Sequence, residues 1–275
     1  MFRENGVQDR VLDPVNILRE IYLTQLVCRG DNIIKLYDVY KEKETGMPAL
    51  VYEYVDNTYF HVLYPQLRPI DCQHYGYEIL KGIAYFHSLG IFHRDIKPNN
   101  IMIDHSIKKL RIIDLGLSKF YFPEDSNMRV GSLSYMSPEL IVEYPKYDLS
   151  VDMWAFGCIL AGWLFRVNIF FKPALNEEHQ MLSIAKVLGS QGLIDYTNKY
   201  QLTLFTKVYD YYNNNSSNTP IPKIPWEYFI NDDNREFVTK DGLDLLSRLL
   251  VYDHKMRISA KDAMRHPYFR DVRVK

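Results

Sequence analysis

Hydrophobic residues recur at a helical spacing in two early segments of this chain of 275 residues. At 15–27 and again at 71–90 they repeat every three or four positions, which is typical of a helix packed on one face. We expect Asp71 to cap the second helix and Gly90 to end it. From residue 176 onward the pattern is again mostly helical. Helices should therefore dominate the later part of the chain.

Four shorter runs of apolar, largely β-branched or aromatic residues predict strands. The runs 33–40 and 49–54 are separated by a polar stretch with one glycine and one proline, which indicates a hairpin. The runs 101–103 and 110–113 flank another polar turn and indicate a second hairpin. Both hairpins lie in the first half of the chain.

The most apolar run, 153–165, is too short to cross a membrane. It is better interpreted as a buried helix, with Ser150 as its N-cap and Asp152 in its first turn. The asparagine and serine tract at 213–218 has little to bury, so it predicts a mobile loop.

Composition narrows the class of protein. The chain is 47% hydrophobic and 24% charged, as expected of one globular unit or two closely apposed lobes. Its net charge of −1 argues against a nucleic-acid partner, since polyanion binding needs a concentrated basic face. The three cysteines are far apart, so we expect reduced thiols and a location in the nucleus and cytoplasm. We expect no signal peptide and no membrane association.

The stretch most informative about chemistry is 93–100, which reads His-Arg-Asp-Ile-Lys-Pro-Asn-Asn. Nineteen residues after Asp95 comes Asp-Leu-Gly, beginning at Asp114. Turns rich in Asp, Asn and Pro are common, but six matching positions in fixed order followed by a second motif are not. Together the two motifs resemble the phosphoryl-transfer site of the protein kinases.

This resemblance implies a role for each polar side chain. Asp95 would accept the proton of the attacking hydroxyl, and Lys97 would place a cation at the transferred phosphoryl group. Asn100 and Asp114 would bind Mg²⁺, which prefers hard oxygen ligands. His93 would be a packed structural histidine. The expected cofactors are ATP and Mg²⁺.

A more specific resemblance extends from residue 28 nearly to the end of the chain. The amino-acid sequence is similar to that of the casein kinase II alpha (catalytic) subunit family in seven segments, 48–58, 77–81, 102–105, 129–130, 138–142, 184–189 and 252–269. That family also lacks the phenylalanine of the usual Asp-Phe-Gly motif, a position held here by Leu115. The resemblance implies that GTP is accepted as well as ATP.

The family resemblance also implies a nucleotide site. Glu53, Tyr54 and Val55 correspond to the hinge whose backbone binds the adenine. Met102 and Ile113 correspond to the residues that enclose the purine from below. Judged alone, such apolar residues are as readily explained by core packing, and only their distances in sequence from the two motifs favour a ligand.

Other residues correspond to supports of the site. Glu20 takes the place of the helix C carboxylate, and Asp152 that of the carboxylate that braces the catalytic-loop backbone. Glu139 and Arg257 correspond to an ion pair that ties the activation segment to the C-terminal helices.

The beginning of the chain departs from the family. Residues 1–34 contain no lysine and only two glycines, so no glycine-rich loop covers the phosphates. Aligning 11–15 with the family's third strand places Arg10 where the phosphate-pairing lysine belongs, and a planar guanidinium does not replace an ammonium there.

Two explanations of this departure compete. Either the chain is a kinase that has lost its first strands, or it is a pseudokinase that retains the fold for binding. The intact catalytic loop favours the first. In both cases we expect weak or no activity from the isolated chain, because aligning the phosphates is a large part of positioning catalysis.

The resemblance further implies protein substrates phosphorylated on Ser or Thr, with acidic residues nearby, and a regulatory beta subunit as partner. In the family, cationic side chains of the activation segment bind the acidic residues of the substrate. Two of these cations are replaced here by Leu133 and Met136, whereas Arg129 remains. The missing strands would also form much of the surface for the beta subunit.

We therefore predict an α+β fold of two lobes. Residues 1–54 would form a reduced N-lobe with helix C and two to three antiparallel strands. Residues 55–275 would form a mainly helical C-lobe.

Overall fold

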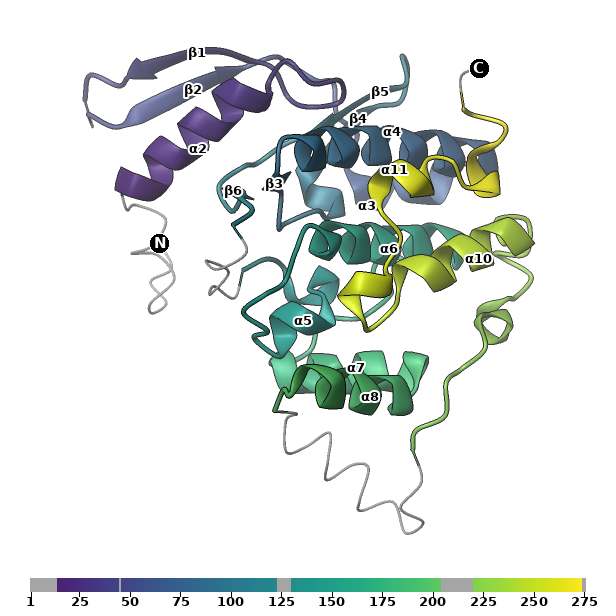
Figure 1. Ribbon diagram of the computed structural model, residues 1–275. Helices are drawn as coiled ribbons and strands as arrows, with labels where there is room; N and C mark the ends of the chain where they lie inside the picture. The colour runs from purple at the N-terminus through teal and green to yellow at the C-terminus, as the bar shows by residue number, and fades with distance from the viewer. Residues whose placement is uncertain (1–13, 45, 123–129, 204–219, 274–275) are drawn as a thin grey trace.

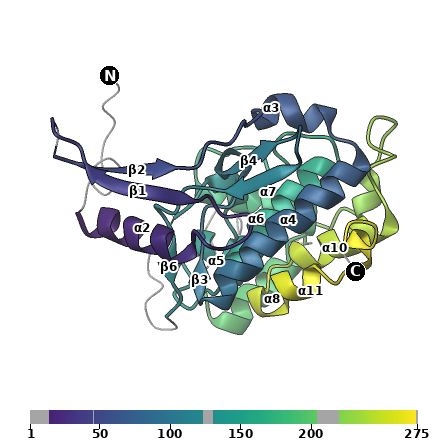
Figure 2. The ribbon, with the colours of Figure 1, turned by 90° about the horizontal axis from the view of Figure 1, so that it is seen from above.

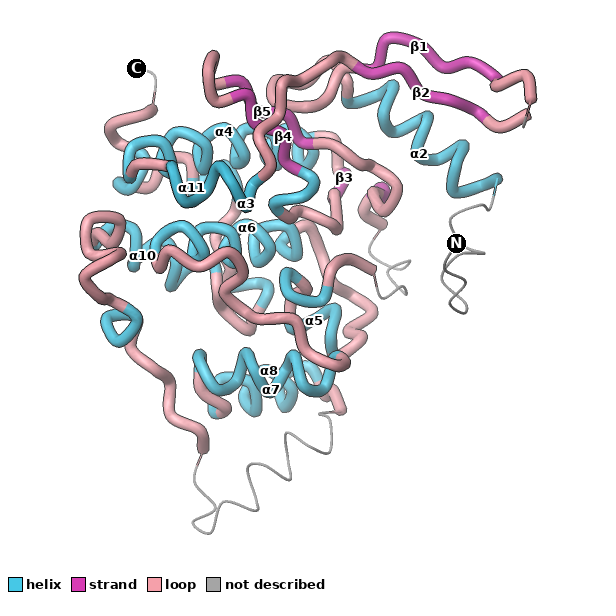
Figure 3. Tube along the Cα trace, turned by 180° about the vertical axis from the view of Figure 1, so that it is seen from behind, coloured by secondary structure: helices cyan, strands magenta, loops and turns pink. Residues whose placement is uncertain are grey.

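The computed structural model describes four stretches of the chain, residues 14–44, 46–122, 130–203 and 220–273. A small part, formed by helix α2 (Pro14–Val27) and strands β1 (Leu36–Lys41) and β2 (Pro48–Tyr52), lies at one end of a larger helical body (Figure 1). The view from behind shows the same division, with the strands near one end and helices filling the other (Figure 3).

The small part is a hairpin packed on one helix. Strands β1 and β2 are antiparallel, with Val39 opposite Leu50. Helix α2 runs alongside them (Figure 2) and buries Leu23 and Val27 completely. The predicted helix at 15–27 and the predicted first hairpin are therefore confirmed.

Two further pairs of short strands lie where the small part meets the helices. Strand β4 (Ile101–Asp104) pairs with β5 (Lys109–Ile112), as the second predicted hairpin. Strand β3 (Ile91–Phe92) pairs with β6 (Lys119–Phe120). The Ile112 backbone N–H donates to the Asn32 oxygen over 2.7 Å, which connects β5 to the segment that precedes β1.

The larger part consists mainly of helices. In chain order these are α3 (Phe60–Leu63), α4 (Pro69–Ser88), α5 (Pro138–Ile141), α6 (Ser150–Leu164), α7 (Glu177–Leu188), α8 (Gln191–Tyr200), α10 (Lys240–Leu249) and α11 (Ala260–Ala263). Single 3-10 turns are found at Tyr64–Gln66, Pro98–Asn100, Leu133–Tyr135, Trp226–Phe229, His254–Met256 and Pro267–Phe269. Helices with a few antiparallel strands make this an α+β fold, as predicted.

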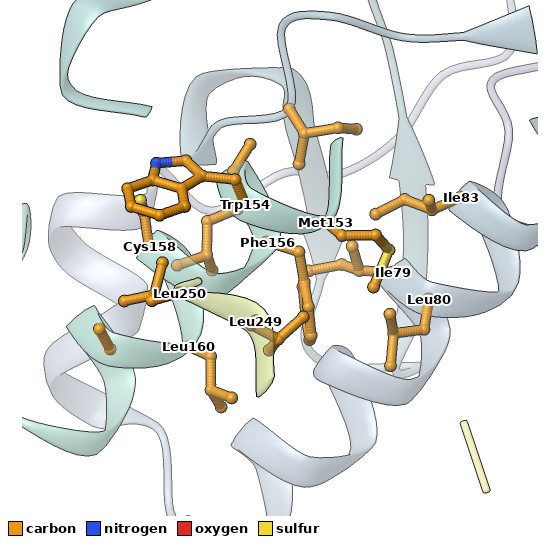
Figure 4. Packing of buried hydrophobic residues seen from close by; sticks show 14 of the residues in the cluster. Ile79, Leu80, Ile83, Met153, Trp154, Phe156, Cys158, Leu160, Leu249 and Leu250 are labelled. Atoms are coloured by element: carbon orange, nitrogen blue, oxygen red, sulfur yellow. The ribbon is translucent and has the colours of Figure 1, made fainter. Parts of the chain in front are cut away.

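Helix α6 forms the centre of the core. Buried residues occur on every side of it, as expected of a helix surrounded by protein. Figure 4 shows its side chains Met153 and Phe156 among Ile79 and Leu80 of α4 and Leu249 of α10. This packed centre holds fixed the elements that carry the loop between β3 and β4.

The predicted N-cap at Ser150 is wrong, whereas Asp71 does cap α4, although from the third position of the helix and not from the N-cap. Arg68 occupies the N-cap position of α4, and Asp71 instead lies in the first turn, where its carboxylate accepts the Arg68 backbone N–H over 3.1 Å. Ser150 is the first residue of α6, and Leu149 holds the N-cap position without a side-chain cap. Gly90 has the left-handed φ of 68° expected after a helix end, so that prediction is confirmed.

The proposed strand at 11–15 is also wrong where it can be checked, since Pro14 and Val15 begin helix α2. Proline favours the first helical turn because its φ is already helical and it lacks the N–H that the turn leaves unpaired. Residues 11–13, with Arg10, lie outside the described residues, and so do 213–218 and Arg129. None of the described helices has the length and apolar character to span a membrane.

Candidate functional site

The loop between β3 and β4 carries three of the predicted catalytic residues and ends in the 3-10 turn Pro98–Asn100. His93 is fully buried, and its Nε2 atom lies 3.0 Å from the backbone oxygen of Ile113. The Ile113 N–H donates to the backbone oxygen of Asn100 over 2.9 Å. The residue before Asp114 is thus held against both ends of the loop.

Asp95 lies within a hydrogen-bonded cluster. Its Oδ2 atom is 2.7 Å from Lys97 Nζ and accepts from Asn100 Nδ2 over 2.9 Å. Its Oδ1 atom accepts from the Ser132 N–H and hydroxyl over 3.1 and 3.0 Å. With the residue only 7% exposed, the carboxylate is held in one orientation. Such a carboxylate is suited to accept a proton from a positioned hydroxyl.

Asn100 and Asp114 supply the type of oxygen atom that binds Mg²⁺. The Asn100 amide nitrogen donates to both the backbone and the side chain of Asp95, so its amide oxygen is directed elsewhere. Asp114 is exposed and has a left-handed φ of 64°. One amide oxygen and one carboxylate suit an ion that retains several waters and also binds substrate phosphates. The residues present therefore fit Mg²⁺.

The predicted brace of the loop is present. Asp152 is 1% exposed, and its two carboxylate oxygens accept the N–H groups of His93 and Arg94 over 2.9 and 2.8 Å. Burial by itself would raise the pKa of Asp152, but the hydrogen bonds and charges of His87 and His93 together outweigh it and hold this pKa below its usual value. Asp152 therefore remains a charged acceptor for the loop backbone.

Glu20 on α2 faces the Asp-Leu-Gly segment. A Cβ atom placed on Gly116 would lie 3.2 Å from Asp114 Oδ1 and 3.4 Å from Glu20 Oε2, so the two carboxylates border the same glycine. Burial, and then the charge of Asp114, raise the pKa of Glu20. Arg19 Nη2 donates to the Gly116 oxygen over 3.5 Å, which ties α2 to this segment.

The predicted hinge, 53–55, is attached to β5 by the side chain of Glu53. This carboxylate lies 2.6 Å from both Lys109 Nζ and Arg111 Nε, and it also accepts the Lys35 backbone N–H over 3.0 Å. Burial would raise the pKa of Glu53, but the hydrogen bonds from Lys109 and Arg111 outweigh it and lower this pKa. The Glu53 side chain thus fixes the hinge to β5 by ion pairs, and these contacts do not use the backbone groups of the hinge.

The hinge backbone retains polar groups for a ligand. The Glu53 N–H donates to the backbone oxygen of Lys35 over 2.9 Å. The Val55 oxygen accepts from the Asn57 N–H over 2.8 Å. Across the stretches that the structure describes, no hydrogen bond occupies the Glu53 oxygen or the Val55 N–H. Tyr54 is 83% exposed, so its side chain is not packed against the rest of the hinge.

Replacing Glu53 by Gln should destabilise the domain by about 2 kcal/mol at neutral pH, because two cations would lose their charged acceptor. Since folding lowers the Glu53 pKa, its stabilisation is complete above the ordinary glutamate pKa and is lost as pH falls through the lower folded-state pKa. Urea unfolding from about pH 7 to about pH 3 should therefore show the two proteins converging. The exposed Glu236→Gln is the control, and a constant difference at every pH would contradict this assignment.

Met102 and Ile113 lie in one cleft of about 130 Å³. Its other lining residues are Asn57, Tyr59, Phe60, Pro98, Asn99 and Ile101. The structure therefore brings the two predicted purine contacts together beside the catalytic loop.

The predicted ion pair between Glu139 and Arg257 is confirmed. Arg257 Nη1 and Nη2 donate to the two Glu139 oxygens over 2.6 and 3.0 Å, and neither side chain is exposed. The pair joins α5 to the segment between α10 and α11.

Sequence reasoning missed two features of the site. Ser132 contacts Asp95 from 37 residues away, and the sequence marked its neighbourhood only by the cations missing at 133 and 136. The contacts of Glu53 with Lys109 and Arg111 were missed because Arg111 was interpreted only as part of a strand and Lys109, just before that strand, was given no role. Lys109 and Arg111 are two positions apart, so a strand places both side chains on the same face. Two cations on one face were the signal for a buried carboxylate opposite them, which is Glu53.

The chain matches the family model of the protein kinase domain over residues 4–269, which is nearly its whole length. The chain belongs to the protein kinase domain family. The kinase domain has here a small lobe of antiparallel strands and a mostly helical larger lobe, so the predicted fold is confirmed. Family membership indicates a phosphotransferase that acts on proteins and generally uses ATP and Mg²⁺. The pseudokinase explanation is not favoured.

Proposed function

We propose that this kinase domain transfers the γ-phosphate of ATP to Ser or Thr residues of proteins, in the manner of the casein kinase II alpha type. The cluster around Asp95 carries the proposal. Lys97 Nζ lies 2.7 Å from the Asp95 carboxylate and 2.8 Å from the Ser132 hydroxyl, so a cation stands beside the proton acceptor. Lys97 at this place in the loop also supports an aliphatic hydroxyl as the acceptor.

In the proposed reaction, the acceptor oxygen forms a bond to the γ-phosphorus while the bond to the β–γ bridging oxygen breaks and ADP leaves. Asp95 takes the hydroxyl proton, and Lys97 stabilises charge on the transferred group. Mg²⁺ bound at Asn100 and Asp114 would neutralise charge on the phosphates. The hinge oxygen of Glu53 and N–H of Val55 would hold the base over Met102 and Ile113.

We expect the reaction of this chain to be slow. Within the described residues, Glu20 forms no ion pair with a lysine, although Asp114 lies near it and raises its pKa. A lysine that joined Glu20 to the phosphates would align the nucleotide, and misalignment of the reacting groups lowers the rate steeply.

Mg²⁺ with ATP should raise the melting temperature of the chain by about 2–4 °C, because a ligand that binds only the folded state stabilises it. Asp114→Asn should abolish the Mg²⁺-dependent part of this rise, whereas Asp232→Asn, at an exposed ion pair, should not. Thermal unfolding with ATP, with and without Mg²⁺, measures both effects. An equal rise without Mg²⁺, or an unchanged rise in Asp114→Asn, would refute the metal site.

The family resemblance alone supports the finer parts of the proposal. These are use of GTP beside ATP, a preference for acidic sequences, a regulatory beta subunit and a location in nucleus and cytoplasm. Leu133 and Met136, in place of cations, weaken the support for an acidic preference. A peptide-library screen with no enrichment of Asp or Glu would remove that preference.

A further inference from the structure

His87, in the last turn of α4, is linked to the catalytic loop through Asp152. Its Nε2 atom lies 3.0 Å from Asp152 Oδ2, the same oxygen that accepts the His93 N–H. The other oxygen, Oδ1, accepts the Arg94 N–H. The imidazole is therefore the third group on a carboxylate whose other two partners are consecutive catalytic-loop amides.

The held segment has a strained backbone. Arg94 has a left-handed φ of 66°, a conformation that a side chain-bearing residue keeps only when its surroundings determine it. Its Nε atom donates to the Leu117 oxygen over 2.7 Å and its Nη1 to the Tyr147 hydroxyl over 3.1 Å. Asp95 is the next residue, so rotation of the peptide between His93 and Arg94 would displace the proton acceptor.

The contact of Asp152 with His87 differs in origin from its two backbone contacts. Two backbone N–H groups fix where the carboxylate oxygens lie, but they are themselves part of the strained segment that needs holding. The His87 imidazole comes instead from α4, a helix of the packed core, and gives the carboxylate a partner that is independent of the loop. Loss of this partner would let the carboxylate and the two amides move together.

His87 also borders solvent on another side. Its side chain is 14% exposed and lines a groove of about 670 Å³. The walls of this groove include Ala84, Met153, Ile258 and Lys261, and none of the residues 93–100 lines it. A small molecule in the groove can therefore reach the position of His87 without entering the catalytic cleft.

We propose that His87 is a positioning residue for phosphotransfer, which fixes the Asp152 carboxylate and through it the catalytic-loop peptide that carries Asp95. The kinetic consequence rests on the proposed function, whereas the structural consequence does not. Hydrogen exchange tests the structural consequence and phosphotransfer tests the kinetic one, so either can fail without the other.

The first measurement is hydrogen exchange at the His93 and Arg94 amides in His87→Ala. Exchange should be about tenfold faster than in the wild type, because local opening exposes these two donors. Free imidazole, entering from the groove into the space left by the missing ring, should restore slow exchange. The control His105→Ala also removes an imidazole hydrogen bond, to Tyr75, and should leave these amides unchanged.

The second measurement is phosphotransfer. His87→Ala should lower kcat by about 10- to 100-fold with little change in the KM for ATP, because the misplaced group is the proton acceptor and not a nucleotide contact. Imidazole should restore activity in parallel with slow exchange. A general structural defect would not produce rescue at the two amides and in kcat together.

Each outcome decides one part. Unchanged exchange at both amides in folded His87→Ala overturns the positioning role. Faster, imidazole-sensitive exchange in a chain with no phosphotransfer supports the positioning role and overturns the proposed function. If His87→Ala does not fold, His87→Gln, which retains an N–H donor, should protect the amides better than His87→Met, and equal exchange in these two variants overturns the role.

Discussion

Phosphotransfer by this kinase domain should fall by about 10²- to 10⁴-fold when Asp95 is replaced by Asn, the range expected on loss of a general base. The amide of Asn has the size of the carboxylate but only one acceptor oxygen, so it can accept either from Ser132 or from Asn100 and Lys97, and part of the cluster should persist without its proton acceptor. The wild-type rate itself should lie well below the roughly 1–100 per second of typical kinases, because residues 1–34 offer no lysine to join Glu20 to the phosphates.

A radioactive ATP assay with a mixed protein substrate, at equal concentrations of the folded wild type and Asp95→Asn, measures this effect. The matched control is Asp104→Asn, which changes an aspartate at the end of β4 whose carboxylate accepts from Ser106 in the following turn. Robust wild-type turnover that Asp95→Asn abolishes would overturn the expectation of a slow enzyme. Equal rates in the wild type and Asp95→Asn would overturn the assignment of Asp95.

Replacing Glu139 by Gln should lower the free energy of unfolding by about 3–5 kcal/mol, because Arg257 would then be a buried charge without its counterion. The two side chains are bidentate and both are 0% exposed. Arg257 also donates to the backbone oxygens of Ser150 and Val251, over 2.8 and 2.9 Å, so it cannot turn toward water without breaking further bonds.

Urea unfolding followed by fluorescence of the buried tryptophans measures this loss. In the exposed pair of Asp232 with Arg235, the corresponding Asp232→Asn should cost less than about 1 kcal/mol. The double variant Glu139→Leu with Arg257→Met removes both charges and should be more stable than Glu139→Gln alone. A loss below about 1 kcal/mol in Glu139→Gln would show that the pair does not hold α5 in place.

Local patterns were predicted well because they depend on residues close in sequence. The helical repeat of α2, the two hairpins and the end of α4 at Gly90 follow from side-chain spacing and backbone preference. The errors concern first turns. Asp71 and Ser150 are both good capping types, but α4 already begins at Pro69, which favours the first helical position, and Ser150 is itself the first residue of α6.

The sequence by itself determined the family and the chemical identity of the candidate site, because His93 to Asn100 and Asp114 are short motifs whose residue types are dictated by the reaction. It could not determine the contacts made across the fold. These contacts join residues far apart in the sequence. Ser132 contacts Asp95 across 37 positions, His87 contacts Asp152 across 65, and the cations that contact Glu53 lie up to 58 positions away.

Such contacts depend on where the core places each element. They are made by polar side chains that carry no periodic signal, since a serine, a histidine or an arginine satisfies many different surroundings equally well. Only the tertiary structure decided that α4 presents His87 to the brace of the catalytic loop and that β5 presents Lys109 and Arg111 to the hinge. The physical reason is that burial demands a partner for each of these carboxylates, and packing alone determines which cation or donor is near enough to supply it.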